Sequence, residues 1–128
     1  MFNTLLVEDN VNFRQALSDV LLSYFPMIGV DEAGDGEEAL SKVEYQRPNL
    51  IFMDVQLPGE SGLEITRQLK RVYTDMVIVI LTSCGQPEYR QQAFLNGADC
   101  FLSKGDSFFM EDMLARVEGV MAREGPRH

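Results

Sequence analysis

Five side chains with ionic or hydroxyl groups stand directly after short apolar runs in this chain of 128 residues. Three are carboxylates, one is a hydroxyl and one is an ammonium: Glu8, Asp9, Asp54, Thr82 and Lys104. Crowded carboxylates repel one another unless a cation compensates their charge. Oxygen ligands of this kind suit Mg²⁺, which retains waters or phosphate oxygens in its other positions. If these residues meet, they predict a magnesium site with a hydroxyl and an ammonium beside it.

The apolar pattern predicts ten alternating elements that would bring these side chains together. Short, partly β-branched runs, typical of strands covered on both faces, lie at 5–7, 28–33, 50–53, 77–81 and 100–102. Amphipathic helical patterns follow them at 13–24, 37–45, 63–73, 87–96 and 110–121. This (βα)₅ order predicts an α/β fold, a doubly wound five-stranded parallel sheet with helices on both faces. Ligands of such sheets bind beyond the carboxyl ends of the strands, where the five side chains fall.

The expected metal ligands differ in how directly they would act. Asp9 and Asp54 are the expected direct ligands of Mg²⁺, the backbone carbonyl of Gln56 is a third candidate, and Glu8 would act through a water. Each side chain also has an ordinary explanation, since Glu8 and Asp9 would serve as caps of the first helix and Lys104 as a surface lysine. All the ordinary explanations would have to hold at once on one rim of one sheet, so we favour a site.

Composition and charge argue against several other classes of protein. Lys and Arg number 11 against 20 Asp and Glu, and the net charge of −9 leaves no basic surface for nucleic acid or an anionic membrane. The two cysteines and the single histidine, at the last position, argue against a zinc site or a histidine-based catalytic pair. We find no signal peptide and no apolar run long enough to span a bilayer, so we expect one cytoplasmic domain.

The segments around the five side chains resemble the receiver (response-regulator) domain of two-component signalling, from about residue 3 to residue 122. The matching segments are LVEDN at 6–10, IFMDVQLPGESG at 51–62, ILTS at 80–83, NGAD at 96–99 and FLSK at 101–104. The resemblance implies the flavodoxin-like strand order 2-1-3-4-5. It assigns residues 3–122 to the receiver domain and residues 123–128 to a tail or the start of a linker.

The resemblance also implies a role for each reactive residue. Asp54 resembles the phosphoacceptor, which takes a phosphoryl group from a histidine kinase or a phosphotransfer protein. Glu8 and Asp9 match the acidic pair that holds Mg²⁺. Thr82 matches the hydroxyl that bonds one phosphoryl oxygen, and Lys104 the cation that pairs with another.

The implied function is a phosphorylation-activated switch rather than an enzyme. Phe101 occupies the aromatic switch position, and it is expected to turn into space that Thr82 vacates. This movement would remodel the face made by the fourth helix, the fifth strand and the fifth helix. The partner would be a downstream protein or effector domain, with transcriptional control if a DNA-binding domain follows, and a phosphorylation-dependent dimer is a further option. The acidic receiver itself would not touch DNA, and no membrane contact is expected.

Two other functions share part of this pattern. Aspartyl-nucleophile phosphatases use similar Mg²⁺ chemistry, but they typically need a second acid where this chain has Gln56, and they enclose substrate with an extra cap. A flavin-binding module of the same fold needs a phosphate loop rich in Ser, Thr and Gly after its first strand, where this chain has Glu8-Asp9-Asn10.

The stretch after Lys104 departs from the family pattern. It reads Gly-Asp-Ser, whereas many receivers have proline after this lysine, and the last helical pattern begins late, behind Phe108 and Phe109. We expect one of these phenylalanines to pack inward and the other to be exposed as a candidate contact with a partner protein.

Overall fold

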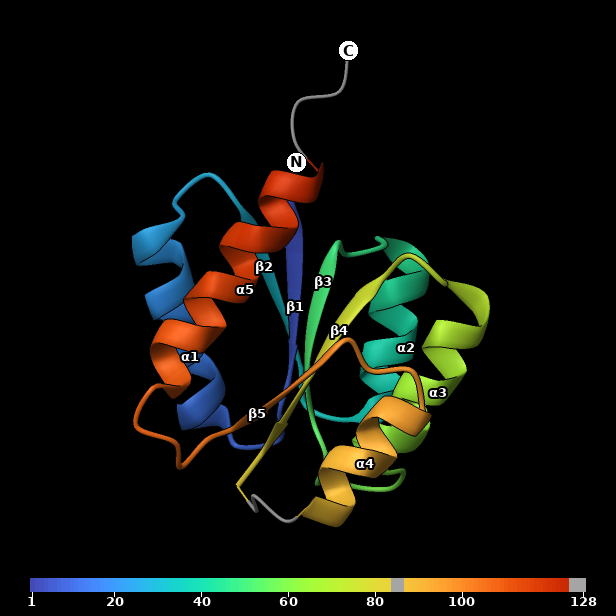
Figure 1. Cartoon of the computed structure of the whole chain (residues 1–128). Helices are drawn as coiled ribbons and strands as arrows, with labels where there is room; N and C mark the ends of the chain where they lie inside the picture. The colour runs from blue at the N-terminus through green and yellow to red at the C-terminus, as the bar shows by residue number, and fades with distance from the viewer. Residues whose placement is uncertain (84–86, 125–128) are drawn as a thin grey trace.

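Five strands alternate with five helices in the computed structural model, which describes residues 1–83 and 87–124 (Figure 1). The strands are β1 (Asn3–Val7), β2 (Gly29–Ala33), β3 (Leu50–Asp54), β4 (Val77–Thr82) and β5 (Cys100–Ser103). The helices are α1 (Val11–Tyr24), α2 (Gly36–Tyr45), α3 (Gly62–Val72), α4 (Pro87–Leu95) and α5 (Phe109–Glu124). The predicted alternation is confirmed. The main boundary difference is α5, which continues through two residues that we expected in the tail, while 125–128 lie outside the described residues.

The five strands form one parallel sheet in the order β2-β1-β3-β4-β5, which confirms the order expected from the resemblance. Strand β1 lies between β2 and β3, so that Leu5 pairs with Asp31 on one side and with Ile51 on the other. The chain moves outward from β1 to β2 and then returns past β1 to β3. Loops therefore diverge where β1 and β3 end, and a parallel sheet binds its ligands at such a point.

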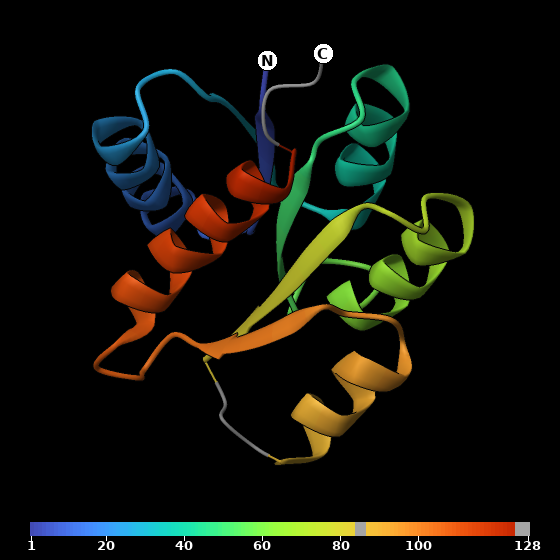
Figure 2. The same cartoon turned by 45° about the horizontal axis from the view of Figure 1, so that its top comes forward.

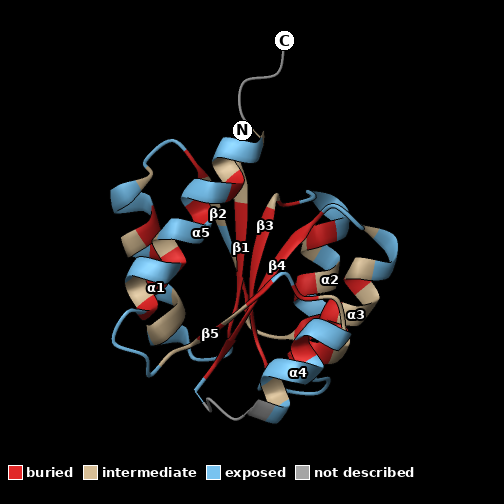
Figure 3. Ribbon diagram, in the orientation of Figure 1, coloured by how far each residue is buried: buried red, intermediate tan, exposed pale blue. Residues whose placement is uncertain are grey.

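Alternate side chains of the sheet enter two hydrophobic clusters, one on each face. In Figure 3 the central strands β3 and β4 are drawn in red, the colour of buried residues. Helices α2, α3 and α4 cover one face, and their buried contributions include Ala39, Val43, Ile65, Leu69 and Ala93. Helices α1 and α5 cover the other face with Leu17, Leu21, Phe109, Met113, Val117 and Val120. Every residue of β3 and β4 is buried, because helices cover both faces of these central strands.

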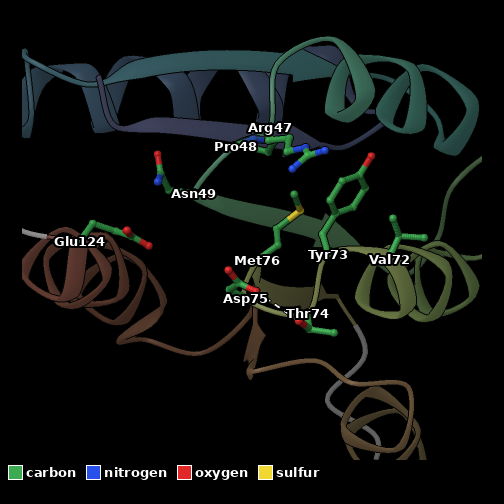
Figure 4. A pocket seen from close by; sticks show the side chains of 9 residues that line it. All are labelled: Arg47, Pro48, Asn49, Val72, Tyr73, Thr74, Asp75, Met76 and Glu124. Carbon is green, nitrogen blue, oxygen red and sulfur yellow. Dashed lines mark hydrogen bonds between the residues drawn. The ribbon is translucent and has the colours of Figure 1, made fainter.

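The edge of the sheet where the strands end, called here the carboxyl edge, carries different side chains from the opposite edge, where the strands begin. Figures 1 and 2 show that α1 and α5 lie side by side. In Figure 1 the carboxyl ends of β1, β3 and β4 point away from the N-terminus. At the opposite edge lies a cavity of about 300 Å³, where the Arg47 guanidinium carbon is 5.0 Å from the centroid of the Tyr73 ring (Figure 4). The five side chains predicted to do chemistry are not among those that line this cavity. The candidate site therefore belongs to the carboxyl edge.

A buried hydroxyl on β1 is poorly satisfied. Thr4 is only 1% exposed, and its Oγ1 has no hydrogen-bond partner among the described residues. The alternation of a strand places its side chain on the same face as Leu6, which belongs to the cluster covered by α1 and α5. A buried hydroxyl without a hydrogen-bond partner has lost its hydrogen bonds to water and has no replacement for them, so it destabilises the folded state.

We therefore expect Thr4→Val to raise the free energy of unfolding by about 1 kcal/mol, because valine keeps the shape and removes the unsatisfied group. Urea denaturation measures the change. Thr66→Val is the matched control, since Thr66 is equally buried but its hydroxyl donates a 2.8 Å hydrogen bond to the Gly62 carbonyl. The control should be destabilised. A loss of stability in Thr4→Val similar to that of the control would contradict the interpretation.

Candidate metal-binding site at the carboxyl edge of the sheet

The three predicted carboxylates do gather at the ends of β1 and β3. Glu8 and Asp9 directly follow β1, and Asp54 is the last residue of β3. Each of the three offers one oxygen, and these oxygens lie within 4.8 Å of one another. Glu8 and Asp54 are 2% and 5% exposed, whereas Asp9 is open to solvent. The acidic cluster is thus largely buried on one side and accessible on the other.

Lys104 joins this cluster from the loop after β5. Its Nζ donates a 2.9 Å hydrogen bond to Asp54 Oδ2 and a second hydrogen bond to Glu8 Oε1. Burial by itself would lower the pKa of Lys104. The hydrogen bonds and negative charges of Glu8 and Asp54 outweigh burial, so the pKa of Lys104 lies above its usual value. The lysine is therefore protonated at neutral pH and places a positive charge at this edge.

The charges in the cluster fit a divalent cation. Three carboxylates face one ammonium, so two negative charges remain uncompensated. Oxygen donors at this spacing, partly open to water, suit Mg²⁺ better than a soft metal. The acidic pocket of Glu8, Asp9 and Asp54 therefore fits magnesium.

Local hydrogen bonds hold the loop after β1 in shape. Asn10, rather than Glu8 or Asp9, caps α1, because its side chain accepts the Phe13 N–H at 3.0 Å. The Asn10 N–H donates in turn to Glu8 Oε2 at 3.2 Å. Arg14 donates to the Glu8 backbone carbonyl at 2.6 Å and to Glu32 Oε1 at 2.8 Å. The acidic pair is thus not needed to cap α1, and hydrogen bonds from Asn10 and Arg14 help to position Glu8.

The loop after β3 is fixed by a close approach of backbones. The Gly62 N–H donates to the Val55 carbonyl at 2.9 Å, and a Cβ added at position 62 would lie 1.8 Å from the Asp54 carbonyl oxygen. No side chain fits there, so glycine is required at the start of α3. The Gln56 N–H also donates to Asp54 Oδ1 at 3.2 Å, which orients the carboxylate.

Thr82 and Phe101 lie on adjacent strands and on the same face of the sheet. Thr82 ends β4, is 2% exposed and is paired in register with Ser103 of β5. Its carbonyl accepts the Lys104 N–H at 2.8 Å, which connects the end of β4 to the lysine. Phe101 is partly buried against the cluster covered by α2, α3 and α4. The alternation of β4 directs the Thr82 side chain to that same cluster.

The two phenylalanines at the start of the last helix, Phe108 just before α5 and Phe109 as its first residue, divide as predicted into one exposed and one buried side chain. Phe109 is 6% exposed and belongs to the cluster under α1 and α5, whereas Phe108 is 64% exposed. The structure also reveals a neighbour of the site that sequence reasoning placed only on an apolar helix face. The Nζ of Lys104 lies 4.6 Å from the centroid of the Phe13 ring. One feature of the sequence does point to Phe13 as a neighbour of the site. This residue stands in the first turn of the helix that follows the acidic pair.

Comparison with known proteins identifies relatives over nearly the whole chain. The family model "Response regulator receiver domain" matches residues 4–118. Response regulator MprA of Mycobacterium leprae is 35% identical over 122 residues, which are 95% of this chain and 52% of that protein. The phosphate regulon transcriptional regulatory protein PhoB of Pseudomonas aeruginosa is 32% identical over 126 residues, with coverage of 95% and 52%. The chain spans about half the length of the curated relatives it matches.

A solved structure agrees with the fold. The response regulator protein TrrA of Thermotoga maritima, in complex with Mg(2+)-BeF, is similar with a TM-score of 0.81 and 29% identity, covering 94% of this chain and 99% of that one. None of the described helices has the length and apolar character that crossing a membrane would require.

Removal of the ammonium should expose the repulsion within the cluster. We expect Lys104→Met, studied without divalent cations, to lower the free energy of unfolding by about 3 kcal/mol, because Glu8 and Asp54 would stay buried without a countercharge. Mg²⁺ should recover more stability in this variant than in the wild type, as measured by urea denaturation with and without the ion.

Lys42→Met is the matched control, since Lys42 makes more exposed ion pairs with Asp31 and Glu38. Its loss should cost less than about 1 kcal/mol and should not respond to Mg²⁺. Equal effects of the two substitutions would show that the cluster does not depend on the lysine charge.

Proposed function

The chain belongs to the response regulator receiver domain family of two-component systems, and on this basis we propose that it is a switch activated by phosphorylation of Asp54. The observation that carries the proposal is the setting of the Asp54 carboxylate. It ends a central strand, is 5% exposed, and lies beside both an ammonium and two further carboxylates. A carboxylate in this position can accept a phosphoryl group, and its surroundings can balance the added charge.

We propose that the phosphoryl group comes from a histidine of a partner kinase or phosphotransfer protein. An oxygen of Asp54 forms a bond to phosphorus while the bond from phosphorus to the histidine nitrogen breaks, and the nitrogen keeps the electron pair. Lys104, already hydrogen-bonded to Asp54, is placed to pair with a transferred oxygen. Phosphoryl transfer depends mainly on positioning and charge, which is what the buried cluster supplies.

Glu8, Asp9 and Asp54 are the residues that would hold Mg²⁺. In this proposal Asp9 and Asp54 are direct ligands, Glu8 acts through a water, and the backbone carbonyl of Gln56 is a further ligand. Bound Mg²⁺ would supply positive charge that offsets the negative oxygens during transfer. The spacing of the three carboxylates supports this assignment, as does the similarity to a protein solved in complex with Mg(2+)-BeF.

We further propose that Thr82 and Phe101 carry the signal away from Asp54. The Thr82 hydroxyl would move to bond a phosphoryl oxygen, and Phe101 would turn into the vacated space. Their common face and adjacent strands support this coupling. The result would be a population shift that changes the surface formed by α4, β5 and α5.

The partners of the switch are proposed from the relatives. PhoB is a transcriptional regulatory protein about twice the length of this chain, so a downstream effector domain or a separate target protein would read the switch, and a phosphorylation-dependent dimer is one form of output. In such an arrangement 3–122 form the receiver and the residues from 123 lead into a tail or linker. The net charge of −9 argues that the receiver acts on protein rather than on DNA.

Turnover of a small substrate is a less favoured function. Aspartyl-nucleophile phosphatases typically need an acid two residues after the nucleophile, and this chain has the exposed amide Gln56 there. An amide cannot donate a proton as a general acid. We therefore propose a signalling role rather than a hydrolytic one.

Intact mass spectrometry after treatment with acetyl phosphate tests the acceptor. We expect a single phosphoryl adduct on the wild type that requires Mg²⁺, and none on Asp54→Ala, because the attacking oxygen is then absent. Asp75→Ala is the control, since Asp75 is exposed and lies beside the cavity at the opposite edge. An adduct that persists in Asp54→Ala, or a folded wild type that stays unmodified, would contradict the assignment.

The switch is tested by separating phosphorylation from its consequence. We expect Thr82→Ala to accept the phosphoryl group but to lose most of the amide chemical-shift changes that phosphorylation causes in α4, β5 and α5, because the moving hydroxyl is missing. Ser83→Ala, which changes the next and exposed hydroxyl, should behave like the wild type. Shift changes of wild-type size in Thr82→Ala would rule out this coupling.

A further inference from the structure

The ammonium of Lys104 has a third partner that is not a carboxylate. Its Nζ lies 4.6 Å from the centroid of the Phe13 ring, within the range of a cation–π contact. Building on the proposed phosphoryl transfer, we propose that Phe13 is a positioning residue, which holds the Lys104 ammonium against the acceptor carboxylate.

A closed ring of contacts runs from Lys104 through Glu8, Asn10 and Phe13 and back to Lys104. Lys104 Nζ donates to Glu8 Oε1, and Glu8 Oε2 accepts the Asn10 N–H at 3.2 Å. Asn10 Oδ1 accepts the Phe13 N–H at 3.0 Å, and the Phe13 ring then faces the lysine again. The backbone of Phe13 is thus fixed by the cap of α1, and its ring is fixed relative to the acidic pair.

A second aromatic ring, from the neighbouring helix α5, supports the ring of Phe13. Phe13 and Phe109 have ring centroids 6.2 Å apart with an angle of 36° between their planes, a tilted arrangement within the separation of interacting aromatic pairs. Phe109 is the first residue of α5 and is 6% exposed, so it is anchored in the core. Figures 1 and 2 show α1 and α5 side by side, in agreement with this contact.

The ring has a property that the other two partners of Lys104 lack. Glu8 and Asp54 are also the groups that would hold Mg²⁺, and Asp54 would receive the phosphoryl group. Their hydrogen bonds to Lys104 must therefore weaken or rearrange during transfer. A phenyl ring is not a ligand for a hard cation, so the contact with Phe13 can persist while the carboxylates change partners. This persistence is what would keep Lys104 in place for the transferred oxygens.

Nuclear magnetic resonance tests the contact independently of phosphorylation. A ring face shields nearby protons, so the Lys104 ε-methylene signals should lie upfield of those of Lys42 and Lys70. We expect Phe13→Leu to abolish this upfield shift and Phe13→Tyr to retain it. Phe25→Leu is the matched control, since Phe25 is a partly buried phenylalanine of the same cluster at the far end of α1, and it should leave the signals unchanged. Unchanged Lys104 signals in Phe13→Leu would overturn the proposal.

The rate of adduct formation with acetyl phosphate and Mg²⁺ tests the positioning role. Loss of a cation–π contact predicts a rate about three- to tenfold lower in Phe13→Leu and close to wild type in Phe13→Tyr and Phe25→Leu. Urea denaturation of each variant shows that it is folded under the assay conditions. Equal rates in Phe13→Leu and the wild type, or a Phe13→Tyr rate as low as that of Phe13→Leu, would overturn the proposal.

The two proposals fail differently. A folded wild type that forms no adduct would contradict the proposed phosphoacceptor chemistry, while the Lys104 signals would still decide whether Phe13 positions the lysine. A wild type that forms the adduct, together with a Phe13→Leu variant that forms it equally fast, would leave the acceptor chemistry standing and remove the role of Phe13.

Discussion

Two buried carboxylates, Glu8 and Asp54, share one ammonium, and the carboxyl edge of the sheet is arranged around that contact. Burial makes like charges costly, so the acids can remain close together only where a cation faces them and the loops that carry them are held firmly. Arg14 holds the backbone carbonyl of Glu8, and the close packing at Gly62 fixes the backbone of Asp54. The uncompensated negative charge makes the carboxylates of the cluster repel one another, and the same charge makes the cluster suitable for a divalent cation.

The position of this cluster gives it access to both hydrophobic cores. On one face, Thr82 ends β4 and Phe101 packs against the cluster under α2, α3 and α4. On the other face, Phe13 contacts Lys104 and lies beside Phe109 at the start of α5. A change of charge at Asp54 would therefore occur close to side chains that reach both layers of helices. Because packed cores shift between discrete arrangements rather than deforming smoothly, such a site is well placed to control a surface.

Most of the fold could be predicted from local pattern. Continuous apolar runs such as 50–53 and 77–81 indicated strands covered on both faces, and both strands are buried at every residue. Local pattern does not predict the boundaries of an element where polar residues extend it. Asn3 and Thr4 lengthen β1 because their backbone pairs with β2, which local hydrophobicity does not report. Helix α5 continues to Glu124 because its backbone hydrogen bonds lie within the helix and do not depend on apolar side chains.

By itself the sequence determined the kinds and spacing of the acidic residues, the hydroxyl and the lysine, the alternation of strands and helices, and therefore the edge at which the side chains collect. Only the tertiary structure decided which side chains touch. The pairing of Lys104 with both Glu8 and Asp54 and the aromatic contact of Lys104 with Phe13 join residues that lie far apart in the chain. Periodicity places a residue on a face, but the distance between two elements depends on how their side chains pack, which no single segment of the sequence contains.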